Sequence, residues 1–358
     1  MRRLPVISAI VAAVLSLSVS CSEPRPVTWQ ATPPVVSDDT GYGAGVSAMY
    51  AGAAGDVLIV AGGANFPDVP AAEGGQKAFY DHIYMYDGEG WHCAGSLPAA
   101  AAYGVSCTIG GRLFAAGGAN GSGAMKTVLA IEPDGNGGVI LTEYPELPYA
   151  VEQAAGAAIG ESLYLFGGIA DGEPSAALFV LDTGDCEAGW RRLAPAPESL
   201  VQPVAAASGG RLYVWGGFDS ATKCVAGRGY CYDPQCDEWS AVAEHPDGGT
   251  FTGAAAVTLA DGRILSTGGV DREIFSAALR LPADKIREYQ LQPVEYYRFQ
   301  RALRIFDPAS GEWSSVGESE CTARAGASLV RFGGGVWLLG GELKPGIRTP
   351  ENRFTADI

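Results

Sequence analysis

A short apolar run that ends in two glycines recurs six times along this chain, and it constrains the fold more than any other feature. The runs are Val57–Gly63, Leu113–Gly118, Leu163–Gly168, Leu212–Gly217, Ile264–Gly269 and Val336–Gly341. Successive glycine pairs lie 55, 50, 49, 52 and 72 residues apart. Scattered turns would not place a matched apolar run before every pair. A self-similar period of this length predicts a fold built from repeated β units.

Most of the repeats also carry a tryptophan further along the chain, directly after a turn. These residues are Trp91, Trp190, Trp239 and Trp313. The combination is typical of kelch repeats, and six units predict an all-β fold, a six-bladed kelch-type β-propeller with four strands per blade. The glycine pair lets the backbone bend and pack closely. The tryptophan is expected to fill the wedge between neighbouring blades.

The repeat pattern at the two ends of the chain predicts how the ring of blades closes. The last pair, Gly340-Gly341, has no tryptophan after it, whereas Thr28-Trp29 has no glycine pair before it. We therefore expect residues near 27–31 to complete the blade that residues near 323–358 begin. The last blade would then be closed by the N-terminal strand, and no edge strand would be left open.

Two blades depart from the common pattern. Blade two lacks the tryptophan and is expected to use Val139–Tyr144 as its outer strand. Blade five carries about twenty extra residues between Gly269 and Trp313, relative to a unit of roughly 50 residues. The composition of residues 274–304 predicts a helical insert of one or two short helices over this blade.

The first twenty residues are predicted to be a signal peptide and not part of the fold. Two arginines precede the apolar stretch Leu4–Val19, which is short for a membrane span. The stretch ends in Leu-Ser-Val-Ser-Cys21, which resembles a lipoprotein cleavage box. We expect Cys21 to be lipidated, with plain secretion and cleavage nearby as the alternative. The expected domains are a signal peptide over 1–20, a tether over 21–27 and a propeller over 28–358.

An exported protein with a lipidated Cys21 would be periplasmic or membrane-anchored in a Gram-negative-type bacterium, with the lipid as its contact with the membrane. The chain has 40 acidic and 24 basic residues and a net charge of −16, and loss of the signal peptide would take the charge to about −18. Nucleic acid is not expected as a partner, because phosphate binding needs a basic surface. Three histidines argue against multi-histidine metal sites. No metal or other cofactor is expected, and a closed propeller is expected to be a monomer.

One face of the propeller is expected to hold the functional site. The loops after the second strands and the loops between blades share this face and converge on the central channel, which is the default pocket. Two stretches there, 62–81 and 340–349, are richer in polar residues than the repeat requires. The candidate binding residues on this face are Asn65, Tyr103, Gln153, Gln202 and Arg324.

These stretches carry a resemblance to a known family. The segments concerned are the Asn65-Phe66-Pro67 region, Tyr103–Ser106, Leu303–Pro308, Trp313–Ser319 and, most specifically, Glu342–Thr349. They resemble the bacterial N-acetylneuraminate epimerases (sialic acid mutarotases), which are six-bladed kelch propellers. The chain is similar to the cyclically permuted branch in particular, because its Glu-x-Lys-Pro-Gly-x-Arg-Thr stretch falls in the last blade instead of mid-chain.

The resemblance implies a mutarotase that interconverts the α and β anomers of N-acetylneuraminate through the open-chain form. Opening needs a base for the anomeric hydroxyl proton and an acid for the ring oxygen, and reclosure reverses the roles. By the family's motif, Glu342 is the proton acceptor and Arg348 a second critical residue, with Lys344 beside them as a binding residue. A guanidinium can hold the sugar carboxylate. The acid for the ring oxygen is not identified.

The chain departs from the family's pattern at three places. A basic residue is expected where Val151-Glu152-Gln153 begins the third blade, an arginine at Ala101, and a histidine among the small residues near Gly253-Ala254. Substrate contacts outside the Glu342 loop are therefore rearranged, which leaves open an isomerase of another acidic sugar. A non-catalytic kelch propeller that binds a glycan or a protein partner also stays open, because the fold alone does not decide function. A sialidase would need repeated Asp-box turns and an arginine triad, which are not evident.

Overall fold

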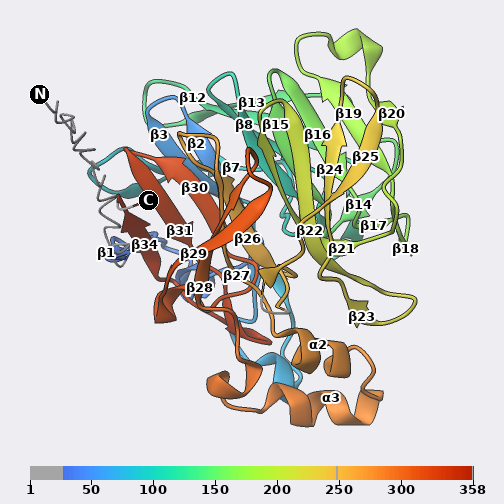
Figure 1. The fold of residues 1–358 in the computed structure, drawn as a ribbon. Coiled ribbons are helices and arrows are strands. Elements are labelled where there is room, and N and C mark those ends of the chain that lie inside the picture. Colours follow the sequence, from blue (N-terminus) through green and yellow to red (C-terminus); the bar gives the residue numbers. More distant parts are fainter. Residues whose placement is uncertain (1–26, 247–248, 357) are drawn as a thin grey trace, which may run out of the picture.

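The computed structural model describes residues 27–246, 249–356 and 358. Nearly all regular structure in these residues is β-strand, which confirms the predicted all-β class. Six antiparallel sheets each contain a continuous path of four strands, and one of these sheets gains a short fifth strand. Figure 1 shows the sheets beside one another, with the largest helices gathered at one end.

Each of these sheets follows one sequence repeat, except that the N-terminal strand joins the last. The first sheet holds β2 (Tyr50–Ala54), β3 (Val57–Ala61), β6 (His82–Tyr86) and β7 (Trp91–Ser96), and the second holds β8 (Val105–Ile109), β9 (Arg112–Ala116), β12 (Val128–Pro133) and β13 (Val139–Glu143). The third holds β15 (Ala155–Ile159), β16 (Ser162–Phe166), β19 (Leu178–Asp182) and β20 (Arg191–Leu193). The fourth holds β21 (Val201–Ser208), β22 (Arg211–Asp219), β24 (Gly229–Asp233) and β25 (Glu238–Val242), with β23 (Cys224–Val225) paired to β22. The fifth holds β26 (Ala254–Thr258), β27 (Ile264–Gly268), β28 (Ala302–Asp307) and β29 (Glu312–Glu318), and the sixth holds β30 (Ser328–Phe332), β31 (Gly335–Leu339), β34 (Asn352–Thr355) and β1 (Gln30–Thr32).

Short elements fill the connections between these strands. The small sheets are β4 (Ala64–Asn65) with β5 (Ala78–Phe79), β10 (Ala119–Asn120) with β11 (Gly123–Ala124), β14 (Val151–Glu152) with β17 (Ile169–Ala170) and β18 (Glu173–Pro174), and β32 (Glu342–Lys344) with β33 (Ile347–Arg348). The short helical turns are α1 (Thr40–Gly43), η1 (Ala71–Glu73), η2 (Cys186–Ala188) and η5 (Glu320–Thr322).

The glycine pairs lie at the end of the second strand in five of the sheets and within β22 in the fourth, with a left-handed backbone and positive φ at both positions of every pair. At Gly62, a Cβ atom would lie 2.2 Å from the carbonyl oxygen of Ala101, in the link to the next sheet. The N–H of Gly63 donates to that same carbonyl at 2.8 Å. The prediction that the pairs permit a bend and a close backbone approach is confirmed.

The repeated tryptophans tie neighbouring sheets together, as predicted. Each indole N–H donates to a backbone carbonyl just after the outer strand of the preceding sheet. The bonds are Trp190 to Pro145 (2.8 Å), Trp239 to Ala194 (2.9 Å), Trp313 to Ala243 (3.2 Å) and Trp91 to Pro33 (3.1 Å). Because Pro33 follows β1, the last of these bonds links the first sheet to the sixth. The second sheet uses β13 as its outer strand, without a tryptophan, also as predicted.

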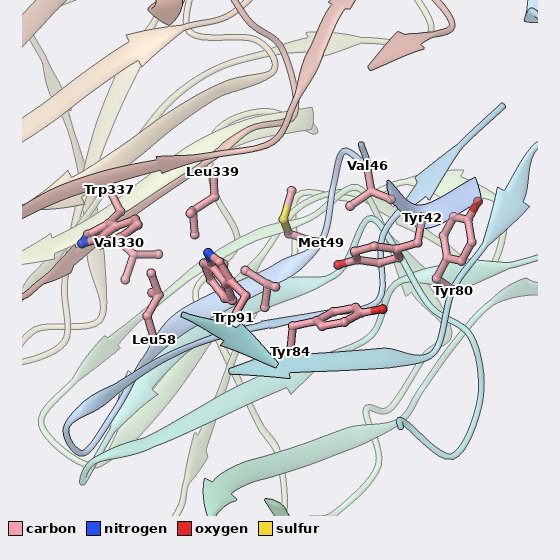
Figure 2. Packing of buried hydrophobic residues seen from close by; sticks show 12 residues of the cluster. Tyr42, Val46, Met49, Leu58, Tyr80, Tyr84, Trp91, Val330, Trp337 and Leu339 are labelled. Atoms are coloured by element: carbon pink, nitrogen blue, oxygen red, sulfur yellow. The ribbon is translucent and has the colours of Figure 1, made fainter. Parts of the chain in front are cut away.

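The two ends of the described chain meet in the sixth sheet. Strand β1 pairs antiparallel with β34, so that Gln30 lies opposite Phe354. A buried apolar cluster then joins this sheet to the first one, and Figure 2 shows Trp91 close to Trp337 and Leu339 within it. The inner strands contact one another in the cyclic order β2, β8, β15, β21, β26, β30 and back to β2.

The insertion after the fifth glycine pair is helical, as predicted. It forms α2 (Arg272–Ala278), α3 (Ala283–Gln290) and η4 (Val294–Tyr297), which lie at the bottom of Figure 1. The Asp271 side chain caps α2 by accepting from the N–H groups of Glu273 and Ile274. Helix α3 reaches across to η1, which follows the second strand of the first sheet. The insert therefore covers the end of the molecule where the glycine pairs lie.

The predicted signal peptide, the lipidation site Cys21 and most of the predicted tether lie outside the described residues, which begin at Val27. Within the described part of the chain, no helix combines the length and the apolar character that crossing a membrane requires.

Candidate active site

Six residues at the starts of the inner strands form a closed ring of backbone hydrogen bonds. All six have a left-handed backbone with φ between 56° and 67°. The N–H of each donates to the carbonyl oxygen of its counterpart in the preceding sheet, over 2.8–3.4 Å, and the N–H of Ala48 closes the ring onto Gly326. The members are Ala48, Tyr103, Gln153, Gln202, Gly253 and Gly326. A left-handed backbone is costly for residues other than glycine, and the ring imposes it here.

A cavity of about 400 Å³ lies over this ring, in the size range of small-molecule sites. All six ring residues line the cavity, together with Glu342 and Pro345 of the β32–β33 hairpin and with Phe275, Tyr289 and Phe299 of the insert. The ring residues of the second, third and fourth sheets carry long polar side chains. Those of the fifth, sixth and first sheets are glycine or alanine. The ring is the floor of the cavity, and one half of this floor carries polar side chains while the other, the low half, has almost no side chains that project into the cavity.

The β32–β33 hairpin places Glu342 opposite Arg348. Gly346, with a φ of 84°, forms the turn that makes this pairing possible across a spacing of six residues. The Glu342 Oε2 atom lies 2.6 Å from Nη1 of Arg348; the carboxylate side chain is 22% exposed and the arginine side chain 4%. The N–H and C=O of Glu342 both bond to Ala325 in the sixth sheet, at 2.7 and 2.9 Å. The ion pair is thereby fixed beside the low half of the floor.

The surroundings of Glu342 favour proton exchange. Burial raises the pKa of its carboxyl group above the usual glutamate value, against the lowering effects of Arg348, the N–H of Gly346 and Lys77. A partly exposed carboxyl group with a raised pKa can accept a proton and return it. Arg348 is held in turn by a bond from Nε to the carbonyl of Ala64 at 3.3 Å.

Lys77 is a further charge at the site, and the sequence analysis did not single it out as a binding residue. Its ammonium nitrogen lies 4.8 Å from the ring centre of Tyr103 and 5.9 Å from that of Phe66. Its charge also acts on Glu342. Unlike Arg348, Lys77 is exposed. It belongs to the polar stretch 62–81 that the sequence did mark, but its residue type alone does not separate it from a surface lysine.

Three of the predicted binding residues, Tyr103, Gln153 and Gln202, lie in the cavity lining. The Gln202 amide donates to Oε1 of Gln153 at 2.7 Å, and the Gln153 amide donates to Glu152 at 3.3 Å. The two amides thus form a short chain along the polar half of the floor, with hydrogen-bonding capacity left for a ligand.

Asn65, another predicted binding residue, serves the scaffold and is not in the cavity lining. Its side chain is 3% exposed. The amide nitrogen donates to the carbonyls of Gly41 and Gly45 at 2.7 and 2.8 Å, and the amide oxygen accepts from Tyr80 at 2.8 Å. These bonds use the polar atoms that a sugar would have needed.

Arg324 is also placed away from the predicted sugar contact. The residue is 2% exposed and donates to the backbone carbonyls of Gly340 and Glu351 at 2.9 and 2.6 Å. Burial lowers the pKa of its guanidinium to about 10, which leaves the group charged at neutral pH. Arg324 precedes the cavity-lining residues Ala325–Ser328, but its own side chain braces the link before β32 and does not line the cavity.

Lys344, the remaining predicted binding residue, reaches the helical insert. Its Nζ atom donates to the carbonyl of Gln292 at 2.7 Å and to that of Gln290 at 3.4 Å. Lysine near a helix C-terminus commonly satisfies the last carbonyls in this way. Lys344 therefore connects the hairpin of Glu342 to α3, and it is not among the residues that line the cavity.

Among the described residues, no group of three or more His, Cys, Asp or Glu side chains is arranged so that it could hold a metal ion. The seven described cysteines are also outside disulfides.

A family model described as N-acetylneuraminate epimerase matches residues 16–140 and 144–356 of the chain. The chain belongs to the N-acetylneuraminate epimerase family. The match includes the Glu342–Arg348 hairpin and the insert, so the resemblance that these segments indicated is confirmed.

Individual members of the N-acetylneuraminate epimerase family match a smaller part of the chain. The N-acetylneuraminate epimerases of Brucella melitensis and Yersinia enterocolitica are each 31% identical, over 61% and 58% of this chain and 60% and 55% of their own lengths. A kelch domain-containing protein of Vibrio cholerae is 30% identical over 58% of this chain and 62% of its own length. The chain thus spans about 60% of the length of such relatives.

A solved structure described as "Structure of YjhT" is similar in fold. It superposes with a TM-score of 0.51 and 29% identity over 57% of this chain and 62% of that one. Together with the antiparallel sheets, this likeness is consistent with a kelch propeller.

Proposed function

We propose that the protein is a mutarotase that interconverts the α and β anomers of N-acetylneuraminate, or of a closely related acidic sugar, through the open-chain form. The observation that carries the proposal is the Glu342 carboxyl group, which has a raised pKa and faces a cavity of about 400 Å³ while paired to Arg348 at 2.6 Å. Membership of the N-acetylneuraminate epimerase family supports the substrate class.

Glu342 supplies the base for ring opening. Its carboxylate takes the proton of the anomeric hydroxyl as the bond from the anomeric carbon to the ring oxygen breaks. The ring oxygen receives a proton from an acid of the site, so that a ketone and a free hydroxyl result. Rotation beside the ketone presents its other face to the same hydroxyl, and closure gives the opposite anomer. The protonated Glu342 then returns its proton to the new anomeric oxygen. A pKa above the usual glutamate value favours this exchange in both directions.

Two cationic side chains, Arg348 and Lys77, have different roles in this proposal. The net charge of −16 repels an anionic sugar, so a local cation must attract its carboxylate. Arg348 is nearly fully buried and already paired, which suits it to orient Glu342 and favour its charged form. Lys77 is exposed and lies over Tyr103 of the cavity floor. We therefore assign the sugar carboxylate to Lys77, and not to Arg348 as the motif first indicated.

The neutral part of the sugar is assigned to the polar half of the floor. The Gln153–Gln202 amide chain offers both donors and acceptors, which match hydroxyl groups and an acylamino group. The low half, formed by Gly253, Gly326 and Ala48, leaves room for the sugar ring beside Glu342. The chain lacks the expected basic and histidine side chains at Gln153 and Gly253, so this division of the floor would set its substrate preference.

The scaffold in this proposal is a closed six-bladed propeller with a permuted blade order. The cyclic contacts of the inner strands and the closed ring of backbone hydrogen bonds support closure. Matches that cover about 60% of each relative support the permuted order, because an alignment in chain order follows only one side of a permutation. Export, lipidation at Cys21 and a monomeric state are proposed from the sequence alone.

Exchange NMR on a panel of sugars tests the substrate class. Magnetisation transfer between the two anomers would be measured for N-acetylneuraminate, glucuronate and glucose, with and without enzyme. We expect accelerated exchange for N-acetylneuraminate and none above background for glucose, which lacks a carboxylate. Acceleration of glucose alone would contradict the proposal. Binding of N-acetylneuraminate without exchange would instead favour a non-catalytic glycan-binding propeller.

A further inference from the structure

Ring opening needs an acid as well as a base, and the residues discussed so far do not provide one. We propose that Tyr289, on the helical insert, donates the proton that the ring oxygen receives during opening and takes it back during closure. This inference rests on the proposed mutarotase function and adds the second proton-transfer group of the same site.

Tyr289 faces the cavity from the side of the insert. It lies in the last turn of α3 and lines the same cavity as Glu342. Its phenol is close enough to feel the charge of Glu342. Within the described residues, its hydroxyl group has no hydrogen-bond partner, whereas the hydroxyl of the neighbouring Tyr297 is bonded. The Tyr289 hydroxyl is therefore available to a ligand that sits against Glu342.

The position of Tyr289 is fixed by three separate contacts. The Tyr297 hydroxyl donates to its backbone carbonyl at 2.5 Å. The ring packs edge-on against Tyr297, with centroids 5.3 Å apart and planes at 80°. Lys344 bonds to the carbonyls of Gln290 and Gln292, which are one and three residues after Tyr289 in the chain. Lys344 is two residues from Glu342, so the base and the phenol belong to one braced unit, as positioned catalytic groups require.

The protonation state of Tyr289 suits a donor. Burial, with smaller effects from Tyr297, Glu342 and Tyr296, raises the pKa of the phenol above its usual value. The phenol therefore carries its proton at neutral pH, when Glu342 must be ionised. During opening, Glu342 gains the anomeric proton while Tyr289 gives its proton to the ring oxygen. Closure reverses both transfers, so that no proton is gained or lost over the cycle.

The other hydroxyl groups in the lining fit this role less well. The cavity has one other lining tyrosine, Tyr103, whose ring lies under the Lys77 ammonium. Ser106 already donates to the carbonyl of Ala51 at 3.2 Å. Serine hydroxyls are also far weaker acids than a phenol. Tyr289 thus remains the phenol that shares the cavity lining with Glu342 and interacts electrostatically with it.

Tyr289→Phe removes the hydroxyl and keeps the ring that packs on Tyr297. The matched control is Tyr296→Phe, because Tyr296 is 45% exposed and belongs to the same cluster. Anomer exchange of N-acetylneuraminate and sugar affinity would be measured for wild type and both variants. We expect Tyr289→Phe to lower kcat by about 100-fold or more with affinity changed by less than about threefold, and Tyr296→Phe to resemble wild type.

The outcomes separate the two proposals. If wild type accelerates exchange and Tyr289→Phe retains its kcat, the assignment of Tyr289 is wrong while the mutarotase function stands. A loss of affinity equal to the loss of kcat/KM, with kcat unchanged, would show a binding role and also overturn the assignment. If wild type does not accelerate exchange, the proposed function and the role of Tyr289 both fall.

Discussion

The Nζ atom of Lys344 lies 2.7 Å from the carbonyl oxygen of Gln292, and this contact joins the hairpin that carries Glu342 to the helical insert. The hairpin lies between β31 and β34 of the sixth sheet and the insert between β27 and β28 of the fifth, so the contact bridges two repeats. Glu342 of the hairpin and Tyr289 of the insert line the same cavity. The cavity is therefore a joint product of segments that are about 50 residues apart.

Removal of this bridge should impair activity more than stability. Lys344→Met keeps the aliphatic stem and removes the ammonium, so α3 loses its anchor and the cavity wall loosens. We expect kcat/KM for anomer exchange to fall roughly tenfold, because small misplacements of catalytic walls are costly. Lys285→Met, at an exposed lysine of α3, is the matched control. Equal activities for both variants would show that the bridge does not position the site.

The acid limb of the pH profile should report Glu342. Because burial raises the pKa of its carboxyl group, kcat/KM should fall with decreasing pH through a midpoint above the usual glutamate value. Arg348 lowers this pKa, so Arg348→Gln should move the midpoint to higher pH and reduce activity at neutral pH. Rates measured between pH 4 and 9 would test this. Arg263→Gln, at an exposed ion pair, should leave the midpoint unchanged; a shift toward lower pH in Arg348→Gln would contradict the account.

Lys77 should act mainly on binding, because its effect on the pKa of Glu342 is smaller than that of Arg348. Lys77→Ala removes the exposed ammonium over Tyr103, so KM for N-acetylneuraminate should rise about tenfold with little change in kcat. The difference from wild type should shrink at high salt, which screens exposed charges. A large fall in kcat with unchanged KM would instead place Lys77 among the proton-transfer groups.

The glycine pairs should be required for two reasons, because they adopt a left-handed backbone and because a Cβ atom at these positions would clash with neighbouring atoms. Gly62 and Gly55 have similar φ values of 64° and 58°, but a Cβ would meet the carbonyl of Ala101 at 2.2 Å in the first and nothing within 4 Å in the second. Gly55→Ala should therefore cost about 1 kcal/mol of unfolding free energy. Gly62→Ala should cost about 3 kcal/mol or more. Denaturant unfolding would test the difference, and equal losses would show that the close approach is unimportant.

The parts of the site that were predictable are those that lie close together in the sequence. Glu342 and Arg348 are six residues apart around a Pro-Gly turn, so a hairpin alone brings them together. The roles of the second-strand glycines and outer-strand tryptophans were likewise predictable, because the pattern that indicates them lies within a single repeat. The all-β class and the helical insert follow from patterns within single repeats.

The remaining parts of the site were not predictable, because they depend on the direction that a side chain takes from a known backbone position. Arg324 directly precedes residues that line the cavity, yet its guanidinium donates to the carbonyls of Gly340 and Glu351. Lys344 extends to α3 and not into the cavity. Lys77 reaches Tyr103 from the loop before β5, across a sheet boundary. The directions of these side chains depend on hydrogen-bond and packing partners in other repeats, and a periodic sequence pattern does not identify those partners.

The most direct test of the central claim is the conversion of freshly prepared α-N-acetylneuraminate, followed by NMR with wild type and with Glu342→Gln. Glu288→Gln, at an exposed glutamate of α3, serves as the control for loss of a carboxylate. The account predicts that wild type and Glu288→Gln accelerate conversion to the β anomer, while folded Glu342→Gln converts it at the uncatalysed rate. Wild-type activity in Glu342→Gln would contradict the assignment of Glu342 as the base.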